Sequence, residues 1–581
     1  MNIKKILLFI ITILSVVVFK IFNNLLLGIV LIIGEYFYIY KLYNHDRRKM
    51  IFGFLFSLIF SSTQVIGYNC YLNDTAALNK IMTYISILIL APTIFIVTWK
   101  LYNIVKKEDI NSNKFYEFLF EKKYSLLVLM LLMILSYLPI LIAFYPGNFS
   151  YDAGTQLRML KFNLVTKYHP VIHTFFLYVT IFTGNRLFSS YNIGLLIHSI
   201  SQIIIMTLIF SYTLIYLNKK KFPKKYNLIF LLLYMFLPTH SVLAITTTKD
   251  IIFSGLFNLV LIKTIELSTN TENFLNNKKN IVVFIIMYFL LLSFRNNMFY
   301  AFLLFIPFVL VVLKKYYKKL IIVFSSIIFI FESYNLFLSN VLKIEDGPKI
   351  EMFSFVVQQF GRVYNKEKLT KEERKNIESL YKNNALEKYN SHISDPIKSE
   401  FNTEELLNDK SKYLKLYLNL FKKYPNTFID SIVNNVYSFF YLNDKLPDKN
   451  AKTYIEINCL DTNNNTFSRS DNCSNKSNLY KNYYKLVRNA KYQNNIILNV
   501  IMNMSFYVLI FIFVLVFTLY KKNYKLFLPL LLLLLYLCTD ILAPVAILRY
   551  VYPFFTAFPI IIYMFYESLD KKGESESRRK L

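Results

Sequence analysis

Long apolar runs recur along most of the 581-residue chain, in which 55% of the residues are hydrophobic. An α-helix needs about 20 consecutive apolar residues to cross a bilayer, and a water-soluble fold could not bury so many runs of this length. The sequence therefore predicts an all-α polytopic membrane protein with about fourteen transmembrane helices. The expected spans are 4–19, 22–42, 50–68, 79–99, 124–145, 191–217, 226–244, 251–267, 280–294, 299–313, 319–338, 496–520, 524–541 and 551–567.

The formal net charge of +30 is concentrated in short loops between these runs. Lysine and arginine in short loops mark the cytoplasmic side of a membrane protein, so the charge is a topology signal and predicts no nucleic-acid partner. It predicts a multi-pass protein of the cell membrane with both termini in the cytoplasm. The basic loops are 45–49, 219–225, 314–319, 521–525 and the C-terminal tail.

The apolar stretch 171–184 is too short to be a convincing span. Runs of about 10–14 apolar residues are more often interfacial or buried helices. As a span, this stretch would move the basic loop 219–225 to the opposite side and invert every later basic loop. We therefore expect 146–190 to be one extracytoplasmic loop that carries a helix on the membrane surface.

The remaining organisation follows from this topology. The N-terminal run lacks a small-residue cleavage site, so we expect a retained span and not a signal peptide. The region 339–495 mixes both signs of charge with aromatic residues, and this composition favours a folded, mainly helical extracytoplasmic domain. The expected segments are 1–123 (four membrane helices), 124–338 (core), 339–495 (domain), 496–567 (C-terminal helices) and 568–581 (basic tail).

Two of the four cysteines, Cys459 and Cys473, lie close together in the polar region. In an extracytoplasmic domain they could form a disulfide, but a pair of free thiols is equally compatible with the spacing. The chain has no CxxC or Cys/His pattern of the kind that binds zinc.

Charged residues recur at the extracytoplasmic mouths of four helices. Ionisable residues at membrane depth are costly and usually line a shared cavity or pathway, so we expect these to form one site. For Asp152 taken alone, the simplest alternative is that it caps a surface helix. The residues are Asp152, Lys249, Asp250, Arg295, Asp540 and Arg549, with Tyr550 beside the last.

Further polar residues are expected near this site. Gln156 lies one turn after Asp152, and Pro170 is expected to start a helix that brings His169 and His173 toward one cleft.

The stretch "EMFSFVVQQFGRV" predicts a helix in the polar domain with one polar face. This face lines the cleft, or it packs the domain against the membrane part, and the pattern favours neither. Its residues are Glu351, Gln358, Gln359 and Arg362.

The missing motifs restrict the chemistry. The chain has no P-loop, GxGxxG, GxSxG or HExxH sequence. An extracytoplasmic enzyme has no nucleotide to draw on, so it needs a donor that is activated inside and delivered through the membrane, such as a polyprenyl-phosphate sugar. Arginine and lysine can hold the phosphate and offset its charge, and a carboxylate can accept the proton of an incoming hydroxyl.

An ordered set of motifs at the outer face resembles the GT-C superfamily of membrane glycosyltransferases, which includes protein mannosyltransferases and aminoarabinose transferases. More narrowly, the set looks like a Gram-positive membrane family of GT-C type, over roughly residues 125–567. The motifs are "YPGNFSYDAGTQ" (145–156), "KYHPVIHT" (167–174), "TTTKDIIF" (246–253), "FRNN" (294–297), "EMFSFVVQQFGRV" (351–363), "SDPIK" (394–398) and "LRYVYP" (548–553).

The resemblance implies an inverting transferase of the cell envelope that uses a polyprenyl-phosphate-linked sugar in the lipid bilayer. Its acceptor would be an extracytoplasmic cell-wall polymer, lipid or protein. Asp152 matches the first acid of the superfamily, which implies the base that activates the acceptor. Asp250 matches the second acid, which implies an assisting group or a metal ligand. Some members use a divalent metal and others do not, so no cofactor is firmly expected.

By the same resemblance, Lys249, Arg295 and Arg549 would grip the donor phosphate, and His169 and His173 would position the acceptor or the phosphate. A multi-pass lipid or polysaccharide transporter, or flippase, is the main alternative. It requires polar residues through the middle of several spans, whereas the span interiors are mostly apolar. A non-catalytic scaffold for wall-synthesis partners is the third interpretation.

Overall fold

The computed structural model describes residues 47–76, parts of 83–98, and 114–569 except for 445–454, 463–466, 471–476 and residue 490. The expected spans 4–19 and 22–42, much of the span 79–99 and the basic tail from residue 570 lie outside the described residues. The described part is mostly helical, as expected, with one small antiparallel hairpin of β1 (Cys459–Asp461) and β2 (Ser468–Ser470).

Six helices of the described part are long and apolar enough to cross a membrane. The bent pair α10 (Lys224–Phe236) and α11 (Pro238–Ala244), with an angle of 50° between its helices, raises the number to seven if it is one span. The protein is therefore membrane-embedded, but the expected count of fourteen spans is not confirmed. The six are α3 (Arg47–Asn73), α6 (Ser125–Ala143), α9 (Tyr191–Lys219), α12 (Lys249–Thr269), α16 (Tyr317–Asn340) with the turn before it, and α26 (Tyr524–Ile541).

Shorter helices complete the bundle, and two expected spans are interrupted. The expected span 496–520 breaks at Asn503, whose side chain accepts a hydrogen bond from the Ser505 amide and starts a new helix there. The expected span 551–567 is broken near Ala557, just before Pro559. These helices are α14 (Lys278–Phe294), α15 (Asn297–Val312), α24 (Ile496–Met502), α25 (Met504–Tyr520), α27 (Tyr552–Thr556) and α28 (Phe558–Leu569).

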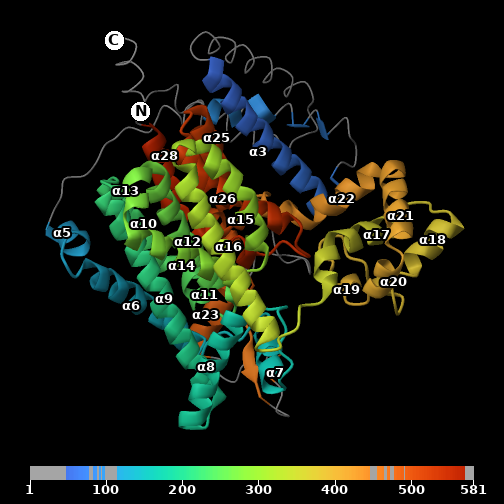
Figure 1. Ribbon diagram of the computed structural model, residues 1–581, viewed down its shortest axis with the longest axis horizontal. Helices are drawn as coiled ribbons and strands as arrows, with labels where there is room; N and C mark the ends of the chain where they lie inside the picture. Colours follow the sequence, from blue (N-terminus) through green and yellow to red (C-terminus); the bar gives the residue numbers. More distant parts are fainter. Residues whose placement is uncertain are drawn as a thin grey trace.

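Helix α12 lies at the centre of the bundle, where it packs against α9, α14, α26 and α27 (Figure 1). Helix α6 lies at the periphery and exposes one apolar stripe, formed by Leu127, Leu131, Leu135, Leu138 and Ile142. Spacings of three and four residues place these side chains on one helical face. An exposed apolar stripe of this kind is the face that a membrane helix turns toward lipid.

The segment 146–190 contains α7 (Ala153–Lys161) and α8 (Val171–Phe188), so the expected helix after Pro170 is present. Helix α8 packs along α9. The segment starts with a close approach at Gly147, which has a φ of 152°, and a Cβ added there would lie 2.2 Å from Ser199 Oγ. Only glycine fits this position.

The polar region 339–495 divides into two parts. Its first part, residues 349–440, is a helical domain with its own core around Phe360, Tyr413 and Phe428; we call it the side domain, because it lies beside the bundle (Figure 1). Its helices are α17 (Ser354–Lys366), α18 (Lys371–Glu378), α19 (Asp395–Lys398), α20 (Thr403–Asn408), α21 (Lys410–Lys423) and α22 (Pro425–Val436).

The second part of the polar region packs back onto the bundle. Phe467 of the hairpin segment lies in a core with Phe149 and Leu157 of the α7 segment. Cys459 is disulfide-bonded, so the alternative of free thiols is wrong; its expected partner Cys473 lies outside the described residues. The remaining short helices are α5 (Lys114–Phe120), α13 (Thr271–Asn276) and α23 (Asn478–Val487).

Candidate functional site

The charged residues expected at separate helix mouths come together at one end of the bundle. They are contributed by the start of α7, the start of α12, the end of α14, the end of α26 and the turn before α27. We call this group the charged site; it consists of Asp152, Lys249, Asp250, Arg295, Asp540 and Arg549.

The floor of the charged site is a buried ion triplet centred on Arg295. Its Nη1 lies 2.5 Å from Asp250 Oδ1 and its Nη2 lies 2.7 Å from Asp540 Oδ1, with side chains 5%, 0% and 0% exposed. The guanidinium also lies 4.6 Å from the ring centre of Tyr550 and 5.3 Å from that of Tyr536. Removing one partner of a buried ion pair leaves an uncompensated charge in a medium of low polarity. The triplet therefore fixes the ends of α12, α14 and α26 relative to one another.

Arg549 joins this floor to the first acid. Its Nη1 lies 3.3 Å from Asp152 Oδ2, 3.2 Å from Asp250 Oδ2 and 3.3 Å from Thr248 Oγ1. The guanidinium stacks 4.3 Å from the centre of the Tyr151 ring. Its Nε is buried and has no hydrogen-bond partner among the described residues. Arg549 thus links the two acids and keeps one donor unused.

Asp152 is the accessible acid of the site, with 33% of its side chain exposed. It lies 3.5 Å from Lys249 Nζ as well as beside Arg549. Burial by itself would raise the pKa of this carboxyl, but Arg549 and Lys249 outweigh burial and hold the pKa well below its usual range. Asp152 is therefore ionised. It occupies the N-cap position of α7, as the helix-cap alternative expects, but its side chain makes no capping hydrogen bond within the described structure.

Backbone strain precedes Asp152. Tyr151 has a φ of 58°, in the left-handed region that bulky residues rarely occupy. Such strain costs on the order of 1–3 kcal/mol and persists where the surrounding structure holds it, often at functional sites. Here it turns the Tyr151 ring under Arg549 while Asp152 faces the cations.

The two histidines have different surroundings. His169 Nδ1 lies 4.0 Å from Asp152 Oδ2 and 3.5 Å from Lys249 Nζ. Burial, followed by the charge of Lys249, lowers the pKa of His169 to about 4, so its imidazole is neutral at pH 7. His173 lies deeper, where its Nδ1 is 3.0 Å from Gln156 Oε1. His169 therefore lies next to the charged site, whereas His173 and Gln156 form a buried pair behind it.

The side domain contributes a charged edge near the site. Glu351 and Asp395 both pair with Lys398, at 3.0 and 2.9 Å. Burial, followed by the negative charge of Glu351 and then that of Asp152, raises the pKa of Tyr168. Tyr168 is therefore near enough to the charged site and to this edge to be affected by the charges of both, and the expectation that Glu351 lines the cleft stays a prediction.

The other three residues expected on that polar face point elsewhere. The Gln358 amide donates to the Asn390 carbonyl, and the Gln359 amide donates to the Phe428 carbonyl. Arg362 donates to the Asp74 carbonyl and lies 3.4 Å from Asp430. Of the two alternatives for this face, the contact of Arg362 with the end of α3 fits packing of the domain against the membrane part, whereas Gln358 and Gln359 bond within the side domain.

The charged site does not fit a divalent metal. The described part of the chain contains no group of three or more His, Cys, Asp or Glu side chains placed to hold one ion. Asp152 and Asp250 already face the cationic groups of Lys249, Arg295 and Arg549. We therefore derive no chemical step through a metal.

Sequence reasoning missed three contributors to the site. Tyr151 and Thr248 contact Arg549, and the Tyr536 ring packs against Arg295. One signal was available: Tyr536 lies four residues before Asp540, and this spacing places two side chains on the same face of a helix. The contact of Tyr151 depends on an unusual backbone conformation, which the sequence does not reveal.

Comparison with known proteins places the chain in a family whose function is not known. A family model described as a family of unknown function, DUF6020, matches residues 161–579. The match contains Lys249, Asp250, Arg295 and Arg549, and it begins nine residues after Asp152. No curated protein and no solved structure matches the chain.

Proposed function

For this chain, which belongs to the DUF6020 family of unknown function, we propose the activity of an integral membrane glycosyltransferase. It would move a sugar from a polyprenyl-phosphate donor to an extracytoplasmic acceptor. One observation carries the proposal: a partly exposed, ionised carboxylate, Asp152, lies against two cations, Lys249 and Arg549, at one end of a bundle of apolar helices. A donor anchored in lipid and an acceptor in water can both reach such a position.

The arrangement of the loops supports an extracytoplasmic site and cytoplasmic termini. Helix α12 starts at the charged site, whereas α14 and α26 end there. The basic loops 314–319 and 521–525 precede α16 and α26, at the ends of these helices away from the site. Basic loops lie on the cytoplasmic side, so the charged site would face outward.

The cations suit the leaving group of this reaction. A polyprenyl-phosphate sugar is a phosphodiester with one negative charge. When the bond between the sugar carbon and the phosphate oxygen breaks, the released phosphate gains a second negative charge. Lys249 and Arg549 would stabilise that developing charge, and the unused Nε of Arg549 offers a further donor.

Asp152 would act as the base. The new bond joins the acceptor oxygen to the sugar carbon, the bond to the phosphate breaks, and the acceptor proton passes to Asp152. The same two cations hold the pKa of Asp152 low, so without bound donor Asp152 is a weak base. A phosphate bound to Lys249 and Arg549 would draw them away, so the pKa of Asp152 would rise when the donor is in place.

The buried triplet would position the reacting groups and would not react. Asp250 accepts from both Arg295 and Arg549, so it orients the guanidinium that faces Asp152. Arg295 is buried beneath this pair and is expected to act on the donor only through Asp250 and Arg549. This assigns Arg295 a positioning role, in place of the direct phosphate contact that the resemblance implied.

The test is transfer of labelled sugar from polyprenyl-phosphate donors in vesicles that contain the full chain. Asp152→Asn should abolish transfer while the amount of protein in the membrane stays the same. Asp409→Asn is the matched control, because Asp409 is exposed, lies far along the side domain, and caps α21 through an oxygen that asparagine keeps. Full activity of Asp152→Asn would refute the assignment. No transfer by the wild type from any donor would favour the flippase alternative, which an assay of lipid movement then tests.

A further inference from the structure

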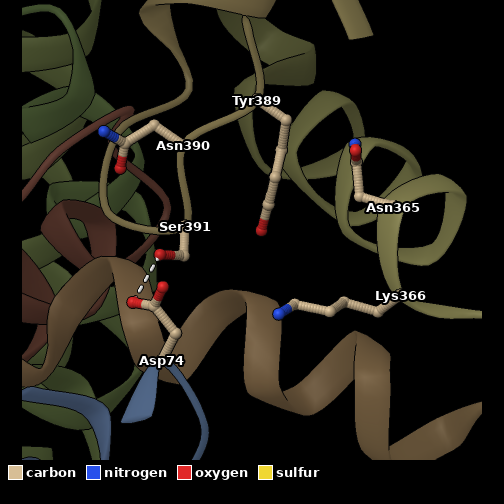
Figure 2. Close-up of a pocket in the computed structure, with 6 residues that line it drawn as sticks. All are labelled: Asp74, Asn365, Lys366, Tyr389, Asn390 and Ser391. Atoms are coloured by element: carbon tan, nitrogen blue, oxygen red, sulfur yellow. Dashed lines mark hydrogen bonds between the residues drawn. The ribbon is translucent and has the colours of Figure 1, made fainter. Parts of the chain in front are cut away.

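A polar cavity of about 380 Å³ lies in the side domain, next to the end of α3. Three segments form it: the residue after α3, the C-terminal turn of α17, and the strand-like stretch before α19. Figure 2 shows Tyr389 reaching into the space between Lys366 on one side and Ser391 with Asp74 on the other. We call it the Tyr389 pocket; it is lined by Asp74, Asn365, Lys366, Tyr389, Asn390 and Ser391.

Of the residues that line this pocket, Tyr389 has a buried hydroxyl that meets no partner with hydrogen-bond geometry in the described structure. Nε and Nη1 of Arg362 and Oε1 of Gln358, which do not line the pocket, are also buried without such a partner. Arg362 lies beside the Tyr389 hydroxyl. Gln358, Arg362 and Lys366 follow one another at intervals of four residues, so they share one face of α17. A buried polar atom without a partner is unfavourable, and a polar ligand in the pocket would offer a partner to the Tyr389 hydroxyl.

The one carboxylate among the residues that line the pocket already has side-chain partners. Asp74 Oδ1 lies 2.8 Å from His392 Nε2 and accepts from the Ser391 hydroxyl at 2.8 Å. His392 Nδ1 faces the Asn434 carbonyl at 3.1 Å, so both ring nitrogens face acceptors. Asp74 is therefore held by two side chains, and this cluster closes one wall of the cavity.

The chemistry of the lining fits a polyhydroxylated ligand. The lining combines amide, hydroxyl, ammonium and carboxylate groups, and a sugar hydroxyl can both donate to and accept from such groups. The Tyr389 ring adds a flat apolar surface with a polar tip, which suits the face of a sugar ring. A compact anion would instead need several converging cations, whereas here an acidic side chain lines the opposite wall.

The same stretch of chain connects the Tyr389 pocket to the charged site. Two residues beyond Ser391, Ile393 pairs with Val545, and the Ser394 amide donates to the Pro544 carbonyl at 2.9 Å. Val545 lies four residues before Arg549. The path from Ser391 to Ile393, across the bridge to Val545 and on to Arg549 is at most roughly 30 Å long at about 3.5 Å per residue, so the pocket lies within that distance of Arg549. A chain-like ligand could therefore extend from one to the other.

We propose that the Tyr389 pocket is a saccharide-binding subsite that holds an acceptor glycan while its end reaches the charged site. Binding of a saccharide is independent of the function proposed above, whereas the role as acceptor subsite rests on that function. The pocket thereby assigns the acceptor to the carbohydrate class.

The test uses the full chain in lipid nanodiscs, which avoids sugar-based detergents, and soluble trisaccharides of N-acetylglucosamine, mannose, galactose and glucose as probes. NMR titration measures their dissociation constants. The wild type should bind at least one probe, and Tyr389→Phe should weaken that binding roughly five- to tenfold through the loss of one hydrogen bond. The melting midpoint of the same variant is measured alongside, and a value close to that of the wild type shows that weaker binding comes from the pocket and not from unfolding.

Tyr364→Phe is the matched control on the same helix. Its hydroxyl donates to Glu378 and accepts from Arg374 on the outer surface, so saccharide binding should not change. Lys366→Gln is a second variant of the pocket itself, and it should also weaken binding. The proposal is overturned if the wild type binds none of the probes, or if both pocket variants bind as the wild type does.

Transfer activity separates this proposal from the proposed function. If the acceptor role is correct, Tyr389→Phe raises the KM for a long glycan acceptor and leaves release of the sugar to water unchanged. Saccharide binding without any transfer by the wild type would retain the subsite and refute the transferase.

Discussion

Replacement by asparagine should change the stability of the protein far more at Asp250 than at Asp152, although both acids belong to the charged site. Asp250 is fully buried and has guanidinium nitrogens at 2.5 and 3.2 Å, whereas one third of the Asp152 side chain is exposed. Replacing either by asparagine removes one negative charge and little volume. We expect Asp250→Asn to unfold the protein much more easily and Asp152→Asn to leave its stability nearly unchanged.

The magnitudes follow from burial. Breaking a buried ion pair from one side costs about 3–5 kcal/mol, because the partner charge stays buried. An ion pair that is partly exposed to solvent contributes about 0–1 kcal/mol. At about 2 °C for each kcal/mol in a large protein, the melting midpoint should fall by roughly 6–10 °C for Asp250→Asn and by less than about 2 °C for Asp152→Asn.

The assay is thermal unfolding of the purified variants in one detergent, with sugar transfer measured on the same samples. Asp152→Asn should be stable and inactive, whereas Asp250→Asn should be unstable. Equal losses of stability would refute the division of the site into a buried floor and an accessible acid. Asp409→Asn again provides the control for removal of an exposed aspartate charge.

Three further outcomes are expected. Arg549→Lys keeps the charge but loses the planar guanidinium that stacks on Tyr151 and the unused Nε donor, so transfer should fall by roughly 10²–10³-fold in the vesicle assay. The pKa of His169 is about 4 in the folded chain and about 6.5 when unfolded, so the unfolded state takes up a proton first as the pH falls. The stability of the folded protein should therefore fall as the pH drops from 6.5 to 4. Melting midpoints at pH 7 and 5 measure this loss, which should be smaller in His169→Gln. Gly147→Ala should reduce the yield of folded protein in gel filtration, because its Cβ would lie 2.2 Å from Ser199 Oγ.

The convergence of the charged residues could be predicted from the sequence because membrane topology restricts it strongly. Once the basic loops are assigned to one side, the ends of alternate helices must meet on the other, and Asp250, Arg295 and Arg549 all lie at such ends. Their pairing could not be predicted. Which acid each arginine contacts depends on the rotation of α12, α14 and α26 about their axes, and apolar spans carry little periodicity that reveals it.

The polar face of α17 shows that helical periodicity in a sequence does not predict the packing partner of a helix. The helical periodicity of Gln358, Gln359 and Arg362 was recognised correctly, but a shared face does not say what it packs against. Here the face turns to backbone carbonyls of the side domain and to Asp74, more than 280 residues earlier in the chain. Likewise, the break at Asn503 depends on a single capping side chain in an otherwise apolar run, so hydropathy alone predicted one continuous span.

The link between the first loop and the start of α12 has a consequence for the lipid environment. Asn148 pairs with Thr246 as a short parallel bridge, and its side-chain amide donates to Thr246 Oγ1 at 2.9 Å. This bridge couples the segment before Asp152 directly to the segment before Asp250. Bilayers of different thickness change the tilt of peripheral helices such as α6, but the spacing of the two acids is set by the bridge and not by those tilts. The charged site should therefore keep one geometry in thin and thick membranes alike.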